Sequence, residues 1–102
     1  MKLNKILNGI KYIGNIQDID IKSISYDSRK INIGSLFVAI EGENFNGHDF
    51  IPDAINNGAH AIIVKCKFQQ KYPVPLIRVV NTRKILSKIA DNFYNHPSSK
   101  IN

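Results

Sequence analysis

Two short apolar runs on either side of a helical pattern constrain the fold of this chain most strongly. Residues 36–40 and 59–64 are almost continuously apolar, which predicts strands that are buried on both faces of a sheet. Between these runs lies one apolar face at helical spacing, formed by Phe50, Ile51, Ala54 and Ile55. A strand, a helix of about two turns and a second strand favour a crossover connection with parallel pairing.

The ends of that helix are marked by residues with known local preferences. Asp49 is placed to cap its first turn, and Pro52 falls in the first turn, where the missing N–H costs little. Asn57 and Gly58 follow the last apolar position and predict its end.

Similar patterns predict the remaining elements. Residues 2–9 predict a short amphipathic helix, residues 19–23 a half-buried strand, and residues 76–80 another buried strand. Asn81 caps a final helix with a clear apolar stripe, and residues 100–102 resemble the start of a further strand. We therefore expect an α/β fold: a small three-layer domain with a mostly parallel sheet of about four to five short strands and flanking helices.

Length and composition point to one soluble domain over residues 1–102. Apolar residues make up 43% and charged residues 22%, and no run approaches the roughly 18 apolar residues that span a bilayer. A formal net charge of +6 favours anionic partners, although the lysines are scattered as on an ordinary solvated surface. Cys66 is the single cysteine, so no internal disulfide can form and a reducing cytosolic compartment fits.

The motifs of several catalytic classes are missing from the sequence. It contains no P-loop, no Gly-x-Gly-x-x-Gly and no nucleophile elbow, and the three histidines, His48, His60 and His96, lie far apart. The loop that contains Gly42 and Gly47 follows an expected strand, so it is either a ligand loop or a plain turn. Residue types and spacing alone thus indicate a binding domain without a catalytic centre or a metal site.

Several motifs resemble the N-terminal domain of the cytoplasmic Mur ligases of peptidoglycan synthesis. The motifs lie at residues 27–30, 34–42, 46–51 and 54–59, beginning with Asp27-Ser28-Arg29-Lys30. Two types share this pattern: the E type adds the third amino acid to UDP-N-acetylmuramoyl-L-alanyl-D-glutamate, and the F type adds D-alanyl-D-alanine. The closing segment, residues 82–98, is more similar to the E type.

The resemblance implies a bacterial, cytoplasmic ligase of cell-wall synthesis, with roles in cell shape and division. The full enzyme would use ATP and Mg²⁺, whereas this chain, without the ATP-binding and C-terminal domains, would hold no cofactor and be inactive alone. Its implied partner is UDP-N-acetylmuramoyl-L-alanyl-D-glutamate, and we expect a monomer without nucleic-acid or membrane partners. The added amino acid would be diaminopimelate or lysine. The alternatives are an F-type ligase and, from another class, a stand-alone basic nucleic-acid-binding module.

The resemblance also transfers a substrate site to this chain. Ser28 would hydrogen-bond the nucleotide end, and Tyr26 would lie near the uracil. Glu43, Asn44 and Phe45 would line the uracil pocket, and the remaining substrate contacts would come from Arg29 and Asn46. Asp27 is expected to brace its turn, Arg29 is either a second brace or a phosphate partner, and His48 is expected to brace its loop.

Overall fold

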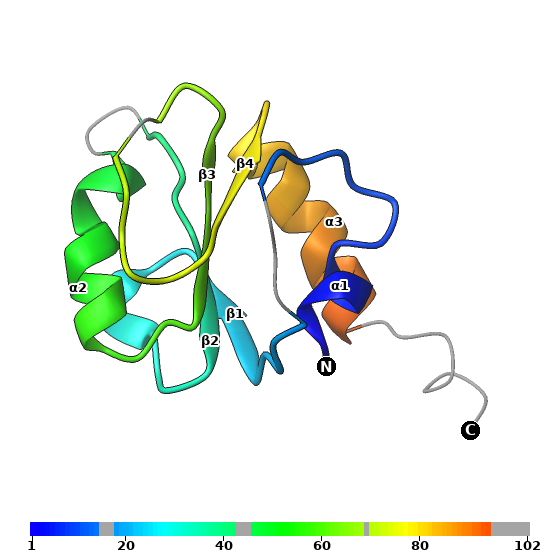
Figure 1. Cartoon of the computed structure of the whole chain (residues 1–102), viewed down its shortest axis with the longest axis horizontal. Helices are drawn as coiled ribbons and strands as arrows, with labels where there is room; N and C mark the ends of the chain where they lie inside the picture. Colours follow the sequence, from blue (N-terminus) through cyan, green and yellow to red (C-terminus); the bar gives the residue numbers. More distant parts are fainter. Residues whose placement is uncertain (15–17, 43–45, 69, 95–102) are drawn as a thin grey trace.

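The computed structural model describes residues 1–14, 18–42, 46–68 and 70–94. Four parallel strands form one sheet in the order β1-β2-β3-β4 (Figure 1). The strands are β1 (Ser23–Ser25), β2 (Ser35–Val38), β3 (Ala61–Lys65) and β4 (Leu76–Val79). The helices are α1 (Leu3–Ile6), α2 (Ile51–Asn56) and α3 (Thr82–Tyr94), with 3-10 helices η1 (Ser28–Lys30) and η2 (Gly47–Phe50).

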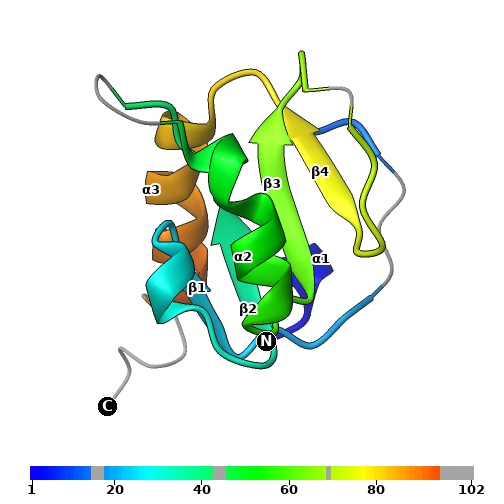
Figure 2. The same ribbon diagram turned by 90° about the vertical axis from the view of Figure 1, so that its left-hand side faces the viewer.

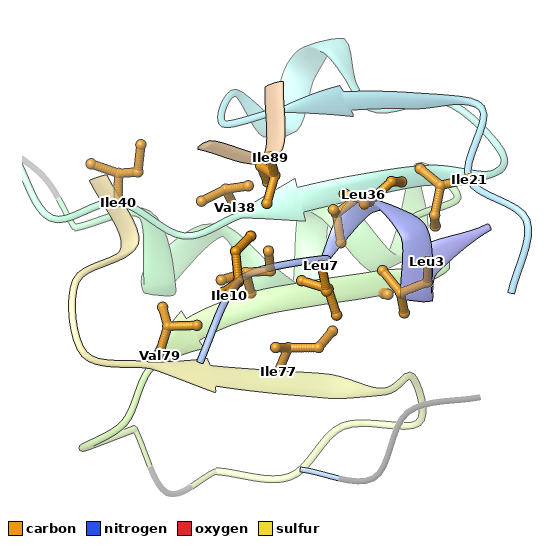
Figure 3. Close-up of a cluster of buried hydrophobic side chains, with 13 residues drawn as sticks. Leu3, Leu7, Ile10, Ile21, Leu36, Val38, Ile40, Ile77, Val79 and Ile89 are labelled. Atoms are coloured by element: carbon orange, nitrogen blue, oxygen red, sulfur yellow. The ribbon is translucent and has the colours of Figure 1, made fainter. Parts of the chain in front are cut away.

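The sheet divides the buried side chains into two clusters because neighbouring residues of a strand point to opposite faces. In β2, Leu36 and Val38 belong to the cluster beneath α1 and α3, whereas Phe37 belongs to the cluster beneath α2. Figure 3 shows the first cluster, in which Leu3 and Ile89 meet the strands. Both faces of the central strands are therefore dry, as their continuous apolar sequence requires.

The helices cover both faces of this sheet and complete three layers. Helices α1 and α3 lie on one side and α2 on the other (Figure 1), and the turned view places α2 in front of β2 and β3 (Figure 2). Parallel pairing of β2 with β3 requires a crossover, which α2 supplies. The expected three-layer α/β fold with a parallel sheet is confirmed.

Several expected boundaries are confirmed. Asn57 is the C-cap residue of α2, Gly58 follows it with φ +113°, and Pro52 lies in the first turn. Asn81 caps α3 by accepting the Lys84 N–H through its side-chain oxygen at 3.0 Å.

Three expectations about element ends are wrong. Asp49 does not cap the crossover helix: it lies inside η2, which is capped by Asn46, and α2 follows without a side-chain cap. The first helix covers only Leu3–Ile6, because the chain turns before Gly9, whose φ is +78°. The first strand begins at Ser23 rather than residue 19, since Asp20 pairs in antiparallel fashion with Lys2 instead. The strand expected at residues 100–102 lies outside the described residues.

Within the described part of the chain, no helix is long and apolar enough to cross a membrane. Among the same residues, no group of three or more His, Cys, Asp or Glu side chains is placed to hold a metal ion.

Candidate functional site

The carboxyl ends of all four strands meet at one edge of the sheet because the strands are parallel. The segments that leave this edge begin at Tyr26 after β1, at Ala39 after β2, at Cys66 after β3 and at Val80 after β4. Open parallel sheets bind their ligands outside this edge. The expected site residues lie on the segments that follow β1 and β2. A ligand site is therefore expected at this edge.

The turn after β1 is braced by its own side chains. The Asp27 carboxylate accepts the Arg29 backbone N–H at 2.9 Å, and its two oxygens also accept Arg29 Nε at 3.1 Å and Nη2 at 2.9 Å. These hydrogen bonds from Arg29 lower the pKa of Asp27. The Ser25 hydroxyl accepts the Asp27 N–H at 3.0 Å. The brace expected of Asp27 is confirmed, and Arg29 forms the second half of it.

This turn lines a cavity of about 610 Å³, which we call the Ser28 hollow. Its walls are Tyr26, Asp27, Ser28, Arg29, Phe50 and Asp53. The volume is within the usual range for small-molecule sites. Three of the transferred residues, Tyr26, Ser28 and Arg29, therefore share one cavity.

Ser28 and Tyr26 bring a hydroxyl and an aromatic ring to the wall of this hollow. The residue is 7% exposed, yet no described residue hydrogen-bonds its hydroxyl. Its backbone is held from α2, because Asn57 Nδ2 donates to the Ser28 carbonyl oxygen at 2.8 Å. Tyr26 is 56% exposed and presents an accessible ring. A serine hydroxyl and an accessible ring in the wall of one cavity are suited to hydrogen bonding and stacking with a flat polar ligand.

A second cavity, the His48 hollow, lies at the same edge and has a volume of about 700 Å³. Its walls are Glu41, Asn46, His48, Asp49, Pro52, Lys65, Lys67, Phe68, Gln70 and Tyr72. Glu41 forms an ion pair with Lys65 Nζ, which lowers the pKa of the Glu41 carboxyl. Asn46, the fourth described residue of the transferred site, faces this hollow and not the first one.

The loop between Glu41 and Asn46 has a narrow, fixed neck. Glu41 and Asn46 pair as an antiparallel bridge, and the Gly47 N–H donates to the Ile40 carbonyl oxygen at 2.7 Å. Arg83 Nη2 donates to the Glu41 carbonyl oxygen at 3.1 Å. A β-carbon on Gly47 would lie 2.6 Å from Ile40 N, so only glycine fits. Glu43, Asn44 and Phe45, the expected uracil pocket, lie outside the described residues.

His48 supports the return end of this neck. The Asn46 side-chain oxygen accepts the His48 backbone N–H at 3.0 Å and lies 2.7 Å from His48 Nδ1. His48 Nε2 accepts the Lys65 N–H at 3.1 Å, and the imidazole lies 4.9 Å from the Phe68 ring. The expectation that His48 braces its loop is confirmed.

The transferred residues are thus divided between two hollows, and other residues join them. Phe50 and Asp53 line the Ser28 hollow, and Lys65 and Lys67 line the His48 hollow. Motif matching missed all four. The available signal was the position of Lys65, which directly follows the buried apolar run and ends β3, with Lys67 two residues further on. Phe50 was assigned to the apolar face of the helix, but it is 39% exposed and lies in the cavity wall.

Comparison with known proteins identifies the family to which this chain belongs. The family model described as "Mur ligase family, catalytic domain" matches residues 20–94. The chain belongs to the Mur ligase family.

Curated relatives of this chain carry a more particular name. Over 105 residues, the chain is 48% identical to the UDP-N-acetylmuramoyl-L-alanyl-D-glutamate–2,6-diaminopimelate ligase of Clostridioides difficile. That match covers 100% of this chain and 21% of the relative. The chain therefore spans about a fifth of the length of the curated relatives it matches.

Solved structures match over most of the chain. MurF from Acinetobacter baumannii superposes with a TM-score of 0.77 over 93% of this chain and 21% of its own length, at 23% identity. MurF ligase from Thermotoga maritima in complex with ADP gives a TM-score of 0.63 at 30% identity, over 78% of this chain and 18% of its own. These likenesses agree with the parallel three-layer fold described above.

Proposed function

We propose that residues 1–102 are the UDP-substrate-binding domain of an ATP-dependent ligase that adds the third amino acid to UDP-N-acetylmuramoyl-L-alanyl-D-glutamate. The observation that carries this proposal is the Ser28 hollow, which gathers Tyr26, Ser28 and Arg29 at the carboxyl edge. The relatives' names supply the substrate, and they favour diaminopimelate over lysine as the added amino acid.

In this proposal the substrate's nucleotide end binds the described edge. Ser28 donates its hydroxyl to the nucleotide, and the exposed Tyr26 ring lies against the uracil. The neighbouring loop brings Glu43, Asn44 and Phe45 to the base, where a stacked ring contributes about 1–3 kcal/mol. The Arg29 guanidinium, exposed beside Asp27, donates a hydrogen bond to the diphosphate.

The peptide-bond chemistry in this proposal belongs to regions that the matched relatives have and this chain does not include. The substrate carboxylate is activated as an acyl phosphate and attacked by the incoming amine. The chain contains no phosphate loop, so ATP and Mg²⁺ would bind elsewhere in a full-length enzyme. Alone, this chain would be an inactive, monomeric binding domain in the bacterial cytoplasm.

Two other functions make different predictions. An F-type ligase shares the fold, but the E-type relative is 48% identical over the whole chain, whereas the F-type structures are 23–30% identical. An RNA-binding module would bind through scattered lysines, and its affinity would fall steeply with salt. Recognition of a uracil base through hydrogen bonds and stacking would not depend on salt in this way.

The test is a titration of the chain with UDP-N-acetylmuramoyl-L-alanyl-D-glutamate, followed by backbone amide shifts in NMR. Shifts are expected at residues 26–29 and 43–47. Ser28→Ala should weaken binding by about 0.5–1.5 kcal/mol, or roughly 2- to 12-fold. Ser87→Ala is the matched control, because Ser87 is exposed on α3 across the sheet. If the shifts lie elsewhere, or Ser28→Ala binds like the control, the assigned site is wrong.

A further inference from the structure

A further cavity lies at the carboxyl edge where α3 begins, and we call it the Thr82 pocket. Its walls include Glu41, Lys65, Asn81, Thr82 and Arg83, and its volume is about 220 Å³. Most small-molecule sites have volumes of roughly 300–1,000 Å³. The Thr82 pocket is therefore large enough for one small polar group but not for a whole nucleotide.

The first turn of α3 forms one wall of this pocket. Asn81 caps the helix, because its side-chain oxygen accepts the Lys84 N–H at 3.0 Å and its carbonyl oxygen accepts the Ile85 N–H at 3.1 Å. The backbone N–H groups of Thr82 and Arg83 have no hydrogen-bond partner among the described residues. Unpaired amides at the start of a 13-residue helix, together with the positive end of its dipole, favour an anion.

The side chain of Thr82 is a second, independent observation in favour of a ligand. Thr82 is 2% exposed, and no described residue hydrogen-bonds its hydroxyl. No fully buried side-chain oxygen or nitrogen in the described part of the chain lacks a partner, so this hydroxyl must keep access to the pocket that Thr82 lines. A nearly buried hydroxyl at the surface of a small cavity is placed to donate a hydrogen bond to a bound group.

The charges at the described walls of the pocket leave a positive excess. Lys65 Nζ forms an ion pair with the Glu41 carboxylate, so these two charges offset each other. Arg83 Nη2 donates to the Glu41 backbone carbonyl oxygen at 3.1 Å. Arg83 forms no ion pair with a described residue. The guanidinium is thus held beside the pocket while its charge is not neutralised by a carboxylate.

We propose that the Thr82 pocket is a binding site for a phosphate group. The phosphate oxygens accept the N–H groups of Thr82 and Arg83 and the Thr82 hydroxyl, and the Arg83 guanidinium supplies the opposite charge. This proposal does not depend on the proposed function, because the pocket and the Ser28 hollow share no wall residue. Free inorganic phosphate and the diphosphate of a nucleotide both carry this chemistry, and the test separates them.

The test is an NMR titration of the chain with three probes at constant pH and ionic strength. The probes are inorganic phosphate, UDP-N-acetylglucosamine, which carries a diphosphate, and uridine, which carries no phosphate. Sodium chloride at the same ionic strength is the blank. The amide signals of Thr82 and Arg83 report on the pocket, and those of residues 26–29 report on the Ser28 hollow.

Two variants remove donors from the pocket, and each has a matched control. Thr82→Val keeps the β-branched shape but removes the hydroxyl, and Arg83→Gln removes the charge of an exposed side chain. The controls Ser87→Ala and Lys88→Gln remove a hydroxyl and a charge from exposed positions on the same helix that do not line the pocket.

In the wild type, at least one phosphate-bearing probe should shift the Thr82 and Arg83 amides in a saturable way, and uridine should not. Thr82→Val should weaken this binding about 10-fold, because a hydrogen bond to a charged group is lost, and Arg83→Gln should weaken it by a similar factor. Both controls should bind like the wild type. A response to inorganic phosphate identifies free phosphate as a ligand, and a response to the sugar nucleotide alone identifies the diphosphate.

Three results would overturn the proposal. The first is that neither phosphate-bearing probe shifts the two amides beyond the chloride blank, even where residues 26–29 respond and so support the proposed function. The second is that uridine shifts them as strongly as UDP-N-acetylglucosamine. The third is that Lys88→Gln weakens binding as much as Arg83→Gln, which would show general attraction by positive charge. Because Arg83 is exposed, this last comparison stands even where Thr82→Val does not fold.

Discussion

Gly47→Ala tests whether the neck of the loop is as rigid as its contacts indicate. The new β-carbon would lie 2.6 Å from Ile40 N and 2.8 Å from Ile40 O, both backbone atoms. They cannot withdraw easily, because the Ala39 N–H next to them donates to the Ile63 carbonyl oxygen at 2.9 Å. Residues 46–48 must move instead, and the hydrogen bond from Gly47 N–H to Ile40 O is then lost.

The expected cost has two parts. Forcing an extra carbon into a packed site costs about 1–3 kcal/mol, and the lost hydrogen bond adds about 1 kcal/mol. We therefore expect the free energy of unfolding to fall by about 2–4 kcal/mol. At roughly 4–8 °C per kcal/mol for a domain near this size, Tm should fall by at least about 8 °C. Urea unfolding followed by circular dichroism measures the loss.

Gly9→Ala is the comparison variant. Gly9 has φ +78°, but the nearest atom to an added β-carbon is the flexible end of Lys88, at 3.7 Å. The backbone strain is partly offset by the reduced entropy of the unfolded chain, so the net loss should be about 1 kcal/mol or less. If Gly47→Ala is no less stable than Gly9→Ala, the neck moves freely and the reasoning about a clamped loop is refuted.

Two further measurements test the supports of the two hollows. Asn57→Ala should lower the free energy of unfolding by about 0.5–1.5 kcal/mol and shift the Ser28 amide signal, because the hydrogen bond to the Ser28 carbonyl is lost. In the control Asn56→Ala, neither the stability nor the Ser28 signal should change. Unfolding free energy should fall as pH drops below 6.5, the ordinary pKa of histidine, because the folded pKa of His48 is lowered and the unfolded chain takes up the proton first. If the unfolding free energy of His48→Phe falls by the same amount below pH 6.5, the loss does not come from His48.

The layer order of the domain could be predicted from the sequence because burial leaves a direct pattern. Residues 36–40 and 59–64 are apolar at nearly every position, and only strands covered on both faces tolerate this. The apolar stripe of α3 is equally direct, since one face packs on the sheet. These parts of the fold depend on side-chain polarity, which can be read residue by residue.

Element ends were less predictable because competing polar groups decide them. Asp49 and Asn46 are both good capping residues, and the outcome depends on where the chain leaves the Ile40 neck. Asn46 lies at that exit and caps η2, so Asp49 is already inside a helical turn. Tertiary contact, not local preference, selects between the two.

The division of the site into two hollows follows from the helical start between them. Asp49 and Pro52 face the His48 hollow, and Phe50 and Asp53 face the Ser28 hollow. Each pair is spaced i, i+3, so each occupies one side of the same turn.

The resemblance placed Ser28 and Asn46 in one substrate site, but the segment from Asp49 to Asp53 separates them. A ligand that contacts both must therefore cross the beginning of η2 and α2. In our proposal the nucleotide end of the substrate makes this crossing.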